Sequence, residues 1–331
     1  MDKSRRGYLI QILFVIILIV IGIWSQKNRL YESNQTAFIM DTFFEIEASG
    51  RLPDLESVVD SAFALATEYE KEFSYYDESS ILNSLNGLQG GSAPAGRDVL
   101  SILETGEYFY KATGGRYDLS IGRLSDLWDI DRGEVPDERA IAEALENTGF
   151  DKIIVTGNQV TVPAGEKLNF GSIAKGYIVD RVVDYLKNKG VSALLVNAGG
   201  DIRVWGTGET CIGIQHPLLS HGEVIDKIII ADKAVVTSGD YERYFEKDSI
   251  RYHHIIDAVT GYPARECVSV TAIADDAETA DALSTAAFLM PVEAALKLAD
   301  DLKGSWVIIY HQDEAGNLLR SLSSGAEKFL E

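Results

Sequence analysis

Two adjacent histidines are the residues of this chain best suited to proton transfer. His253 and His254 stand in the segment Tyr252–Gly261, which reads YHHIIDAVTG, in an acidic protein that has five histidines in all. Neighbouring residues of a β-strand point to opposite faces, so only one of the two can face a given site. Turn residues follow, and a histidine at a junction of strand and turn is well placed to move protons near neutral pH. A buried, hydrogen-bonded histidine beside a turn is the alternative interpretation.

A second candidate for chemistry is a carboxylate with two hydroxyls on one expected helix. Asp281 and Thr285 are four residues apart and Ser284 adjoins Thr285, so their oxygens project from one helical face. These oxygens suit a hard cation such as Mg²⁺, which also accepts a phosphate ligand. The alternative is structural, with Thr279 as the helix cap and Asp281 complementing the helix dipole.

A third candidate is the glycine-containing segment Gly171–Gly176, which reads GSIAKG. It opens an expected helix, and free backbone N–H groups beside Lys175 would make a cradle for an anion such as a pyrophosphate. The segment lacks the order of residues of a P-loop, and Gly206–Gly208 does not continue into a dinucleotide fingerprint. The segments Asn197–Asp201 and Thr237–Tyr241 suit either close backbone approach to a ligand or simple turns.

Elements that would position these residues follow from periodicity and turn residues. Strands and helices mix without strict alternation, which predicts an α+β fold in one catalytic domain. Helices are expected over residues 54–73, 98–113, 137–148, 173–189, 278–290 and 292–302. Strands are expected over residues 36–48, 193–197, 202–205, 211–215, 227–231, 234–238, 267–274 and 306–311, with a hairpin over residues 152–162.

The start of the chain differs from the rest. A basic segment, 1–7, precedes an uncharged apolar run over residues 8–24, which is at the short end of the roughly 17–25 residues that span a bilayer. No Ala-x-Ala-like cleavage site follows, so the run is predicted to be an uncleaved transmembrane signal-anchor rather than a removed signal peptide. Residues 25–35 are expected to form a tether and residues 36–331 the catalytic domain. The basic N-terminus would stay in the cytoplasm, with the catalytic domain on the extracytoplasmic side of the cell membrane.

Charge and cysteine content exclude some classes of function. The chain has 51 Asp and Glu against 30 Lys and Arg, so a surface for nucleic acid is not expected. Cys211 and Cys267 lie far apart and have no zinc-binding spacing. They could pair in an oxidising compartment or remain free buried thiols.

The ordered set of motifs resembles the FAD:protein FMN transferase family, also known as ApbE-like flavin transferases. The resemblance extends from about Thr36 to the C-terminus, and no single motif carries it. It departs from the family pattern at Asp41, where the family has glycine, and at Asn169, where an aspartate is frequent. The matching segments are Met40–Thr42, Ser79–Asn86, Gly171–Tyr177, Asn197–Asp201, Thr237–Tyr241, Tyr252–Asp257 and Asp281–Thr285.

The resemblance implies an ApbE-like fold and a Mg²⁺-dependent transferase. Such an enzyme would move FMN from FAD to a Thr or Ser hydroxyl of an extracytoplasmic acceptor, commonly an electron-transfer subunit, and release AMP. The resemblance assigns His254 as the base that activates the hydroxyl. Contacts with FAD are implied for Met40, Tyr76, Arg116, Tyr117, Asp118, Asn169, Lys175 and the backbone of Ile255. Magnesium contacts are implied for Ser172, Asp281, Ser284 and Thr285.

Two other functions are compatible with the same residues. Water in place of the protein hydroxyl would make the enzyme an FAD pyrophosphatase that yields FMN and AMP. A membrane-tethered flavoprotein that binds FAD without chemistry is the other, but the joint presence of a histidine, a carboxylate and hydroxyls favours an enzyme.

Overall fold

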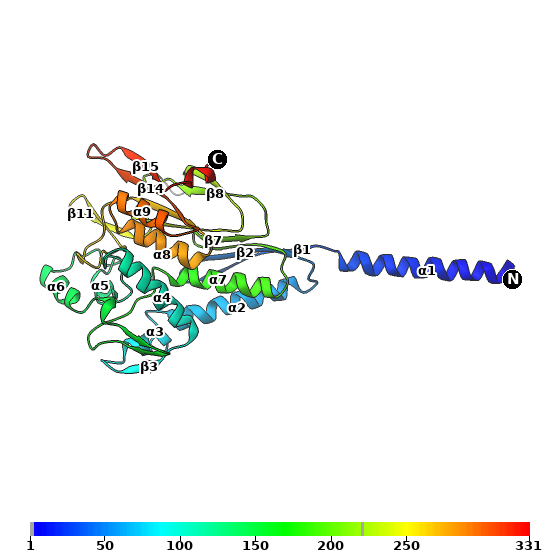
Figure 1. The fold of residues 1–331 in the computed structure, drawn as a ribbon, viewed down its shortest axis with the longest axis horizontal. Helices are drawn as coiled ribbons and strands as arrows, with labels where there is room; N and C mark the ends of the chain where they lie inside the picture. The colour runs from blue at the N-terminus through cyan, green and yellow to red at the C-terminus, as the bar shows by residue number, and fades with distance from the viewer. Residues whose placement is uncertain (1–2, 220–221) are drawn as a thin grey trace.

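A sheet of eight antiparallel strands forms the centre of the molecule (Figure 1). The computed structural model describes residues 3–219 and 222–331. Met1 and Asp2, part of the expected basic segment, lie outside the described residues. The spatial order of the sheet is β1-β2-β6-β7-β10-β13-β14-β15. Its strands are β1 (Tyr31–Ile39), β2 (Thr42–Gly50), β6 (Ala193–Ala198), β7 (Asp201–Trp205), β10 (Ala234–Gly239), β13 (Ser269–Ala274), β14 (Trp306–Gln312) and β15 (Leu318–Leu322).

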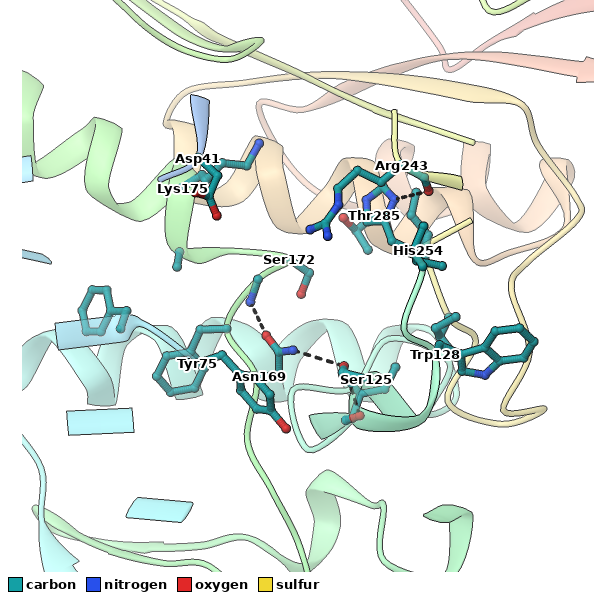
Figure 2. Close-up of a pocket in the computed structure, with 18 of the residues that line it drawn as sticks. Asp41, Tyr75, Ser125, Trp128, Asn169, Ser172, Lys175, Arg243, His254 and Thr285 are labelled. Atoms are coloured by element: carbon teal, nitrogen blue, oxygen red, sulfur yellow. Dashed lines mark hydrogen bonds between the residues drawn. The ribbon is translucent and has the colours of Figure 1, made fainter. Parts of the chain in front are cut away.

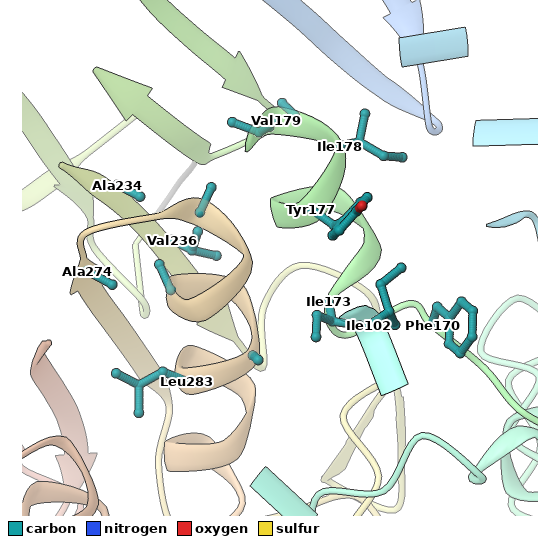
Figure 3. Close-up of a cluster of buried hydrophobic side chains, with 14 of the residues drawn as sticks. Ile102, Phe170, Ile173, Tyr177, Ile178, Val179, Ala234, Val236, Ala274 and Leu283 are labelled. Carbon is teal, nitrogen blue, oxygen red and sulfur yellow. The ribbon is translucent and has the colours of Figure 1, made fainter. Parts of the chain in front are cut away.

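Helices cover one face of this sheet and create the main core (Figure 3). Alternation along the strands decides which side chains take part: Ala234 and Val236 of β10 face the helices, whereas Val235 faces the other side. Leu283 and Ile178 come from the two helices that meet over the centre of the sheet. The helices of this layer are α2 (Leu55–Phe73), α4 (Arg97–Ala112), α7 (Ala174–Asn188), α8 (Ala277–Phe288) and α9 (Val292–Asp301).

The opposite face of the sheet has a smaller core. A hairpin of β8 (Thr210–Gln215) and β9 (Val224–Ile230) covers it, together with the 3-10 helix η2 (Ala326–Phe329). Burying apolar side chains on both faces makes the central strands β10 and β13 almost entirely inaccessible to solvent.

A third group of elements packs around Trp128. It comprises α5 (Gly122–Leu127), α6 (Glu138–Glu146) and the hairpin of β11 (Tyr244–Lys247) and β12 (Ile250–His253). Trp128 stacks on Tyr252, and its indole N–H donates to the carbonyl of Gly261. The remaining short elements are α3 (Ile81–Asn86), the 3-10 helix η1 (Phe150–Lys152), and the small sheet of β3 (Ser92–Pro94), β4 (Ile154–Thr156) and β5 (Gln159–Thr161).

Helix α1 (Lys3–Lys27) extends away from the body of the fold (Figure 1). Within residues 3–219 and 222–331, the structure has no helix of the length and apolar character needed to cross a membrane. The expected tether is corrected at both ends: residues 25–27 continue α1, and residues 31–35 form the first half of β1. Residues 31–35 were not recognised as part of a strand because they are mostly polar. They are polar because β1 lies at the edge of the sheet and exposes one face to water.

The expected α+β fold is confirmed, and the six expected helices lie within two residues of their observed bounds. The single strand expected over residues 36–48 is wrong. Met40 and Asp41 interrupt it as a two-residue turn, with φ values of 56° and 55°, and the chain reverses into β2. No Asn-Gly or Asp-Gly pair marks this turn, so the usual sequence signal of a tight hairpin is missing.

Candidate active site

A pocket of about 760 Å³ lies between the helical layer and the group of elements around Trp128. Figure 2 shows His254, Arg243 and Thr285 across the pocket from Tyr75, Asn169 and Ser125. Segments that are far apart in sequence therefore build one cavity. The expected site residues that line it are Met40, Tyr76, Arg116, Tyr117, Asp118, Asn169, Ser172, Lys175, His254, Ile255 and Thr285.

His254 lines the pocket, and only one of its ring nitrogens has a hydrogen-bond partner among the described residues. Its backbone N–H donates to the carbonyl of Arg243 over 3.1 Å, and its Nδ1 is 3.3 Å from the same oxygen. A carbonyl can only accept, so Nδ1 carries the hydrogen and Nε2 is left with a lone pair. Enclosure by the pocket walls and the nearby charges of Arg243 and Lys175 lower the pKa of His254. The ring is therefore neutral at pH 7 and able to accept a proton.

His253 points the other way and has a structural role. It is buried, its Nε2 donates to the carbonyl of Ala264 over 2.7 Å, and its Nδ1 accepts from the N–H of Ile255 over 3.2 Å. Burial lowers its pKa to about 4. The expectation that only one of the two histidines faces the site is confirmed.

The chain before α7 is held in place by Asn169. Its Oδ1 accepts from the N–H of Gly171 over 2.9 Å, and its Nδ2 donates to Ser125 over 3.1 Å. Ser172 donates to the hydroxyl of the buried Tyr117 over 3.0 Å. Neutral Asn169 thus orders this turn with an oxygen and an N–H group, whereas an aspartate would offer only oxygens.

Lys175 brings a positive charge to the first turn of α7. Its Nζ lies 3.0 Å from Oδ1 of Asp201, a residue that is 1% exposed. Burial alone would lower the pKa of Lys175, but the carboxylates of Asp201 and Asp281 outweigh it and raise the pKa. Lys175 therefore stays charged and lines the pocket beside the N-terminus of α7, as binding of an anion requires.

Asp281 and Ser284 lie behind the wall of the pocket that Thr285 and Ser238 form. Oδ2 of Asp281 accepts from the N–H of Gly176 over 2.9 Å. Ser284 is fully buried and donates to the carbonyl of Asp281 over 2.9 Å, while Ser238 lies 2.8 Å from Ser284 and 3.3 Å from Thr285. Burial and the charge of Asp201 raise the pKa of Asp281, against the opposing effect of Lys175.

The described residues contain no group of three or more His, Cys, Asp or Glu side chains that could hold a metal ion. Any cation near Asp281 would therefore depend on hydroxyl oxygens and on oxygens of a ligand as well. Oδ1 of Asp281 makes no hydrogen bond within the part of the chain that the structure describes, so this oxygen is available.

The turn between β1 and β2 forms one edge of the pocket. The N–H of Met40 donates to Glu70 over 2.6 Å, and both Met40 and Asp41 line the cavity. Asp41 has a positive φ, which glycine adopts freely and which aspartate tolerates better than most residues. Tyr76 also lines the pocket and is 84% exposed, which leaves its ring free to contact a ligand.

Three expected ligand contacts are already bonded within the protein. Arg116 pairs with the buried carboxylate of Asp257. The carboxylate of Asp118 accepts hydrogen bonds from Ser120 and from the N–H of Phe150, so it links the segments that contain these residues. The backbone of Ile255 donates to His253 and accepts from Ala264.

Several pocket residues were not identified from the sequence. Ser238 belongs to the segment Thr237–Tyr241, for which close backbone approach to a ligand and a simple turn were both open, and Arg243 follows this segment. Tyr75 donates to Asp126 over 2.7 Å and lies beside Tyr76. These residues are recognised as pocket residues only by contacts between segments that are distant in sequence, and the periodicity of the sequence does not predict such contacts.

The fold and the pocket are those of an α+β protein in which a charged lysine at a helix start and a neutral histidine line one cavity. The chain belongs to the ApbE family, whose model matches residues 40–309. It is 32% identical over 317 residues to a protein of Treponema pallidum (strain Nichols) named FAD:protein FMN transferase, covering 88% of this chain and 87% of that one. The expected family resemblance is confirmed.

Solved structures agree with this assignment. The crystal structure of the ApbE protein from Thermotoga maritima has a TM-score of 0.79 and 34% identity, covering 88% of this chain and 97% of that one. The flavin transferase ApbE from Vibrio cholerae has a TM-score of 0.82 and 26% identity, covering 91% of this chain and 100% of that one.

Proposed function

We propose that this protein is an FAD:protein FMN transferase, which moves FMN from FAD to a hydroxyl of an acceptor protein. Membership of the ApbE family and the name of the Treponema pallidum relative support the reaction class. The observation that carries the proposal is one pocket that is lined by a neutral histidine, by a charged lysine at a helix N-terminus and by the hydroxyl of Thr285, with the carboxylate of Asp281 behind its wall.

FAD is proposed to place its diphosphate near the start of α7. Lys175 and the positive end of the α7 dipole would attract the phosphates, because a helix N-terminus and an ammonium group both favour negative charge. The exposed ring of Tyr76 and the edge formed by Met40 would contact the aromatic parts of the dinucleotide.

The chemistry proposed for His254 is removal of the acceptor's proton. Nε2 of His254 would take the proton of a Thr or Ser hydroxyl while the hydroxyl oxygen bonds to the phosphorus of the FMN half. The bond from that phosphorus to the bridging oxygen breaks, and AMP leaves with this oxygen. Because Nδ1–H is held by the carbonyl of Arg243, the free lone pair remains on Nε2 throughout the approach of the hydroxyl.

The residues around Asp281 fit a Mg²⁺ ion. Oδ1 of Asp281 and the hydroxyl of Thr285 are hard oxygen donors, and Ser172 lines the same pocket. Burial raises the pKa of Asp281, and the carboxylates of Asp201 and Glu242 add to this effect through a repulsion that a divalent cation would relieve. When bound, the ion would neutralise charge on the diphosphate. The buried hydroxyl of Ser284 is bonded to Ser238 and to Asp281, so we assign Ser284 to supporting these ligands.

Asp281→Ala tests the proposed cation site. Removing the carboxylate leaves only neutral oxygens, so we predict little transfer at modest Mg²⁺ and partial recovery when Mg²⁺ is raised about a hundredfold. Transfer is measured against Mg²⁺ concentration for the wild type and the variant. An unchanged Mg²⁺ dependence would remove Asp281 from the site.

Hydrolysis of FAD is the second candidate reaction, since the pocket that admits a hydroxyl also admits water. The protein is incubated with FAD and Mg²⁺, with and without a Thr-bearing flavinylation acceptor domain, and the products are separated by chromatography. We expect AMP together with protein-bound FMN when the acceptor is present. Free FMN and AMP at equal rates in both reactions would instead identify a pyrophosphatase.

We also propose that the catalytic domain acts on the extracytoplasmic side of the cell membrane, on a membrane-associated acceptor. The support is the uncharged run at residues 8–24, many of whose described apolar side chains are exposed on α1. Membrane fractionation and protease treatment of spheroplasts test this location. Full-length protein recovered in the soluble cytoplasmic fraction would contradict it.

A further inference from the structure

Helices α7 and α8 each supply a carboxylate to the N-terminal amides of the other. The N–H of Gly176 in α7 donates to Asp281 of α8 over 2.9 Å. The N–H of Glu278 in α8 donates to Oδ2 of Asp180 in α7 over 2.8 Å. The first N–H groups of a helix have no partner within the helix, so these two bonds satisfy donors that would otherwise be unpaired.

The N-terminus of α7 needs a carboxylate from another element because its own segment supplies no side-chain cap. The residue before α7 is Ile173, whose apolar side chain cannot cap the helix, and it makes no side-chain cap bond. Helix α8 already has a cap of its own, because Asp276 accepts from the N–H of Thr279 over 2.7 Å. The N-terminus of α8 is therefore already capped, and the bond from Glu278 to Asp180 serves to connect α8 with α7.

The two bonds together define how the helices are placed along each other. Gly176 and Asp180 are one turn apart on α7, and they meet Asp281 and Glu278 on α8 in reverse order. The helices touch closely here, since a Cβ on Gly176 would lie 2.2 Å from the carbonyl oxygen of Ala277. Two such bonds, one turn apart, fix both the distance between α7 and α8 and the position of α8 along the axis of α7.

We propose that Asp180 is a positioning residue, which sets the register of α8 against α7 so that Asp281 and Thr285 meet the phosphate-binding start of α7. Asp180 is 7% exposed and is not among the residues that line the pocket, so it does not touch a ligand there. It acts through Asp281, a group whose usefulness depends on its placement to within about half an ångström. The link to catalysis rests on the proposed function, whereas the link between the helices does not.

The charge around Asp180 explains why a carboxylate occupies this place. The guanidinium of Arg203 lies 3.6 Å from Oδ1 of Asp180, and Oδ2 receives the N–H of Glu278. Asparagine at this position would keep an oxygen for the N–H of Glu278, whereas alanine would leave the amide of α8 without its partner.

The test compares Asp180→Ala with Asp276→Ala, which removes the cap that α8 receives from its own segment. Hydrogen exchange of the Gly176 amide is measured without substrate, and transfer is measured against Mg²⁺ concentration. We expect Asp180→Ala to speed exchange at Gly176 about tenfold and to raise the Mg²⁺ needed for half-maximal transfer about tenfold, the size expected for a lost cap. Asp180→Asn should restore both values. Asp276→Ala should lower Tm but leave the exchange rate of the Gly176 amide and the Mg²⁺ needed for half-maximal transfer unchanged.

Asp180→Ser serves if Asp180→Ala does not fold, because its shorter side chain falls short of the Glu278 amide while remaining polar, and the same two changes are expected in weaker form. If the Asp180 variants lower Tm but match Asp276→Ala in Gly176 exchange and Mg²⁺ dependence, Asp180 is a structural cap and the proposal is wrong. If the wild type transfers no FMN, the proposed function fails, while the exchange measurement still decides the role of Asp180.

Discussion

Two adjacent histidines illustrate how chemistry is assigned at the scale of a residue. Both ring nitrogens of His253 are hydrogen-bonded inside the protein, whereas among the described residues only Nδ1 of His254 has a partner. The same side chain is therefore a structural residue at one position and a candidate base at the next. His253 is the buried last residue of β12, whereas His254 follows the strand and lines the pocket.

His254→Ala is predicted to abolish transfer and preserve FAD binding. The alanine cannot accept the hydroxyl proton, which costs a rate factor of roughly a hundred or more, but it leaves the phosphate-binding start of α7 intact. Transfer is followed by adduct formation and binding by the quenching of flavin fluorescence. His311→Ala is the control, because His311 bonds to Ser321 at the far edge of the sheet. Transfer at the wild-type rate in His254→Ala would end its assignment as the base.

His253 should make the protein less stable in mild acid. Its pKa falls from 6.5 in the unfolded chain to about 4 in the folded protein, because burial disfavours the charged ring. Below pH 6.5 the imidazole of His253 binds a proton in the unfolded chain but stays neutral in the folded protein. The free energy of unfolding therefore decreases as the pH drops from 6.5 towards 4, by up to roughly 3 kcal/mol.

The variant His253→Asn isolates this contribution. It loses stability at pH 7.5, where the wild type keeps both hydrogen bonds of the ring, but it has no group that titrates at this position. Denaturant unfolding at pH 7.5 and pH 5 should show a smaller loss for the variant than for the wild type. Equal losses in the two proteins would assign the acid sensitivity to other groups.

At the scale of elements, the site depends on the close approach of α7 and α8. Gly176 permits it, and Gly176→Ala would place a Cβ 2.2 Å from the carbonyl oxygen of Ala277 and 2.7 Å from Cβ of Asp281. The helices would have to separate, which moves Asp281 away from the start of α7.

We predict that Gly176→Ala lowers the free energy of unfolding by about 1–3 kcal/mol and reduces transfer by more than the stability loss explains. Calorimetry and transfer at a temperature where both proteins remain folded separate the two effects. Gly96→Ala is the control, because a Cβ at Gly96 meets no atom within 4 Å. Wild-type transfer in the Gly176 variant would show that the spacing of the helices is not critical.

The helices and the inner strands of the sheet were predictable from the sequence to a degree that the first hairpin and the pocket were not. Apolar residues at helical spacing mark α2, α4 and α7 without any knowledge of their partners. The first half of the edge strand β1 escaped detection because its polar face is solvated, and the turn at Met40 and Asp41 lacks glycine. The roles of Arg243 and Ser238 depend on contacts between distant segments, which no local pattern encodes.

At the scale of the whole molecule, the catalytic body is separate from helix α1. Among the residues that the structure describes, the lining of the pocket begins at Met40 and the sheet begins at Tyr31. A fragment of residues 30–331 should therefore fold, bind FAD and transfer FMN with a kcat/KM within about twofold of the full chain in detergent. A fragment that folds, as judged by calorimetry, and yet has lost transfer would show that residues 1–29 contribute to catalysis.

The intact mass of an acceptor protein tests the central claim most directly. The acceptor is incubated with FAD, Mg²⁺ and either the wild type or His254→Ala, and each sample is analysed by mass spectrometry. The account predicts a gain of one FMN phosphoester on a single Thr or Ser with the wild type and an unmodified mass with the variant. An unmodified acceptor in the wild-type reaction, while FAD is bound and consumed, would contradict it.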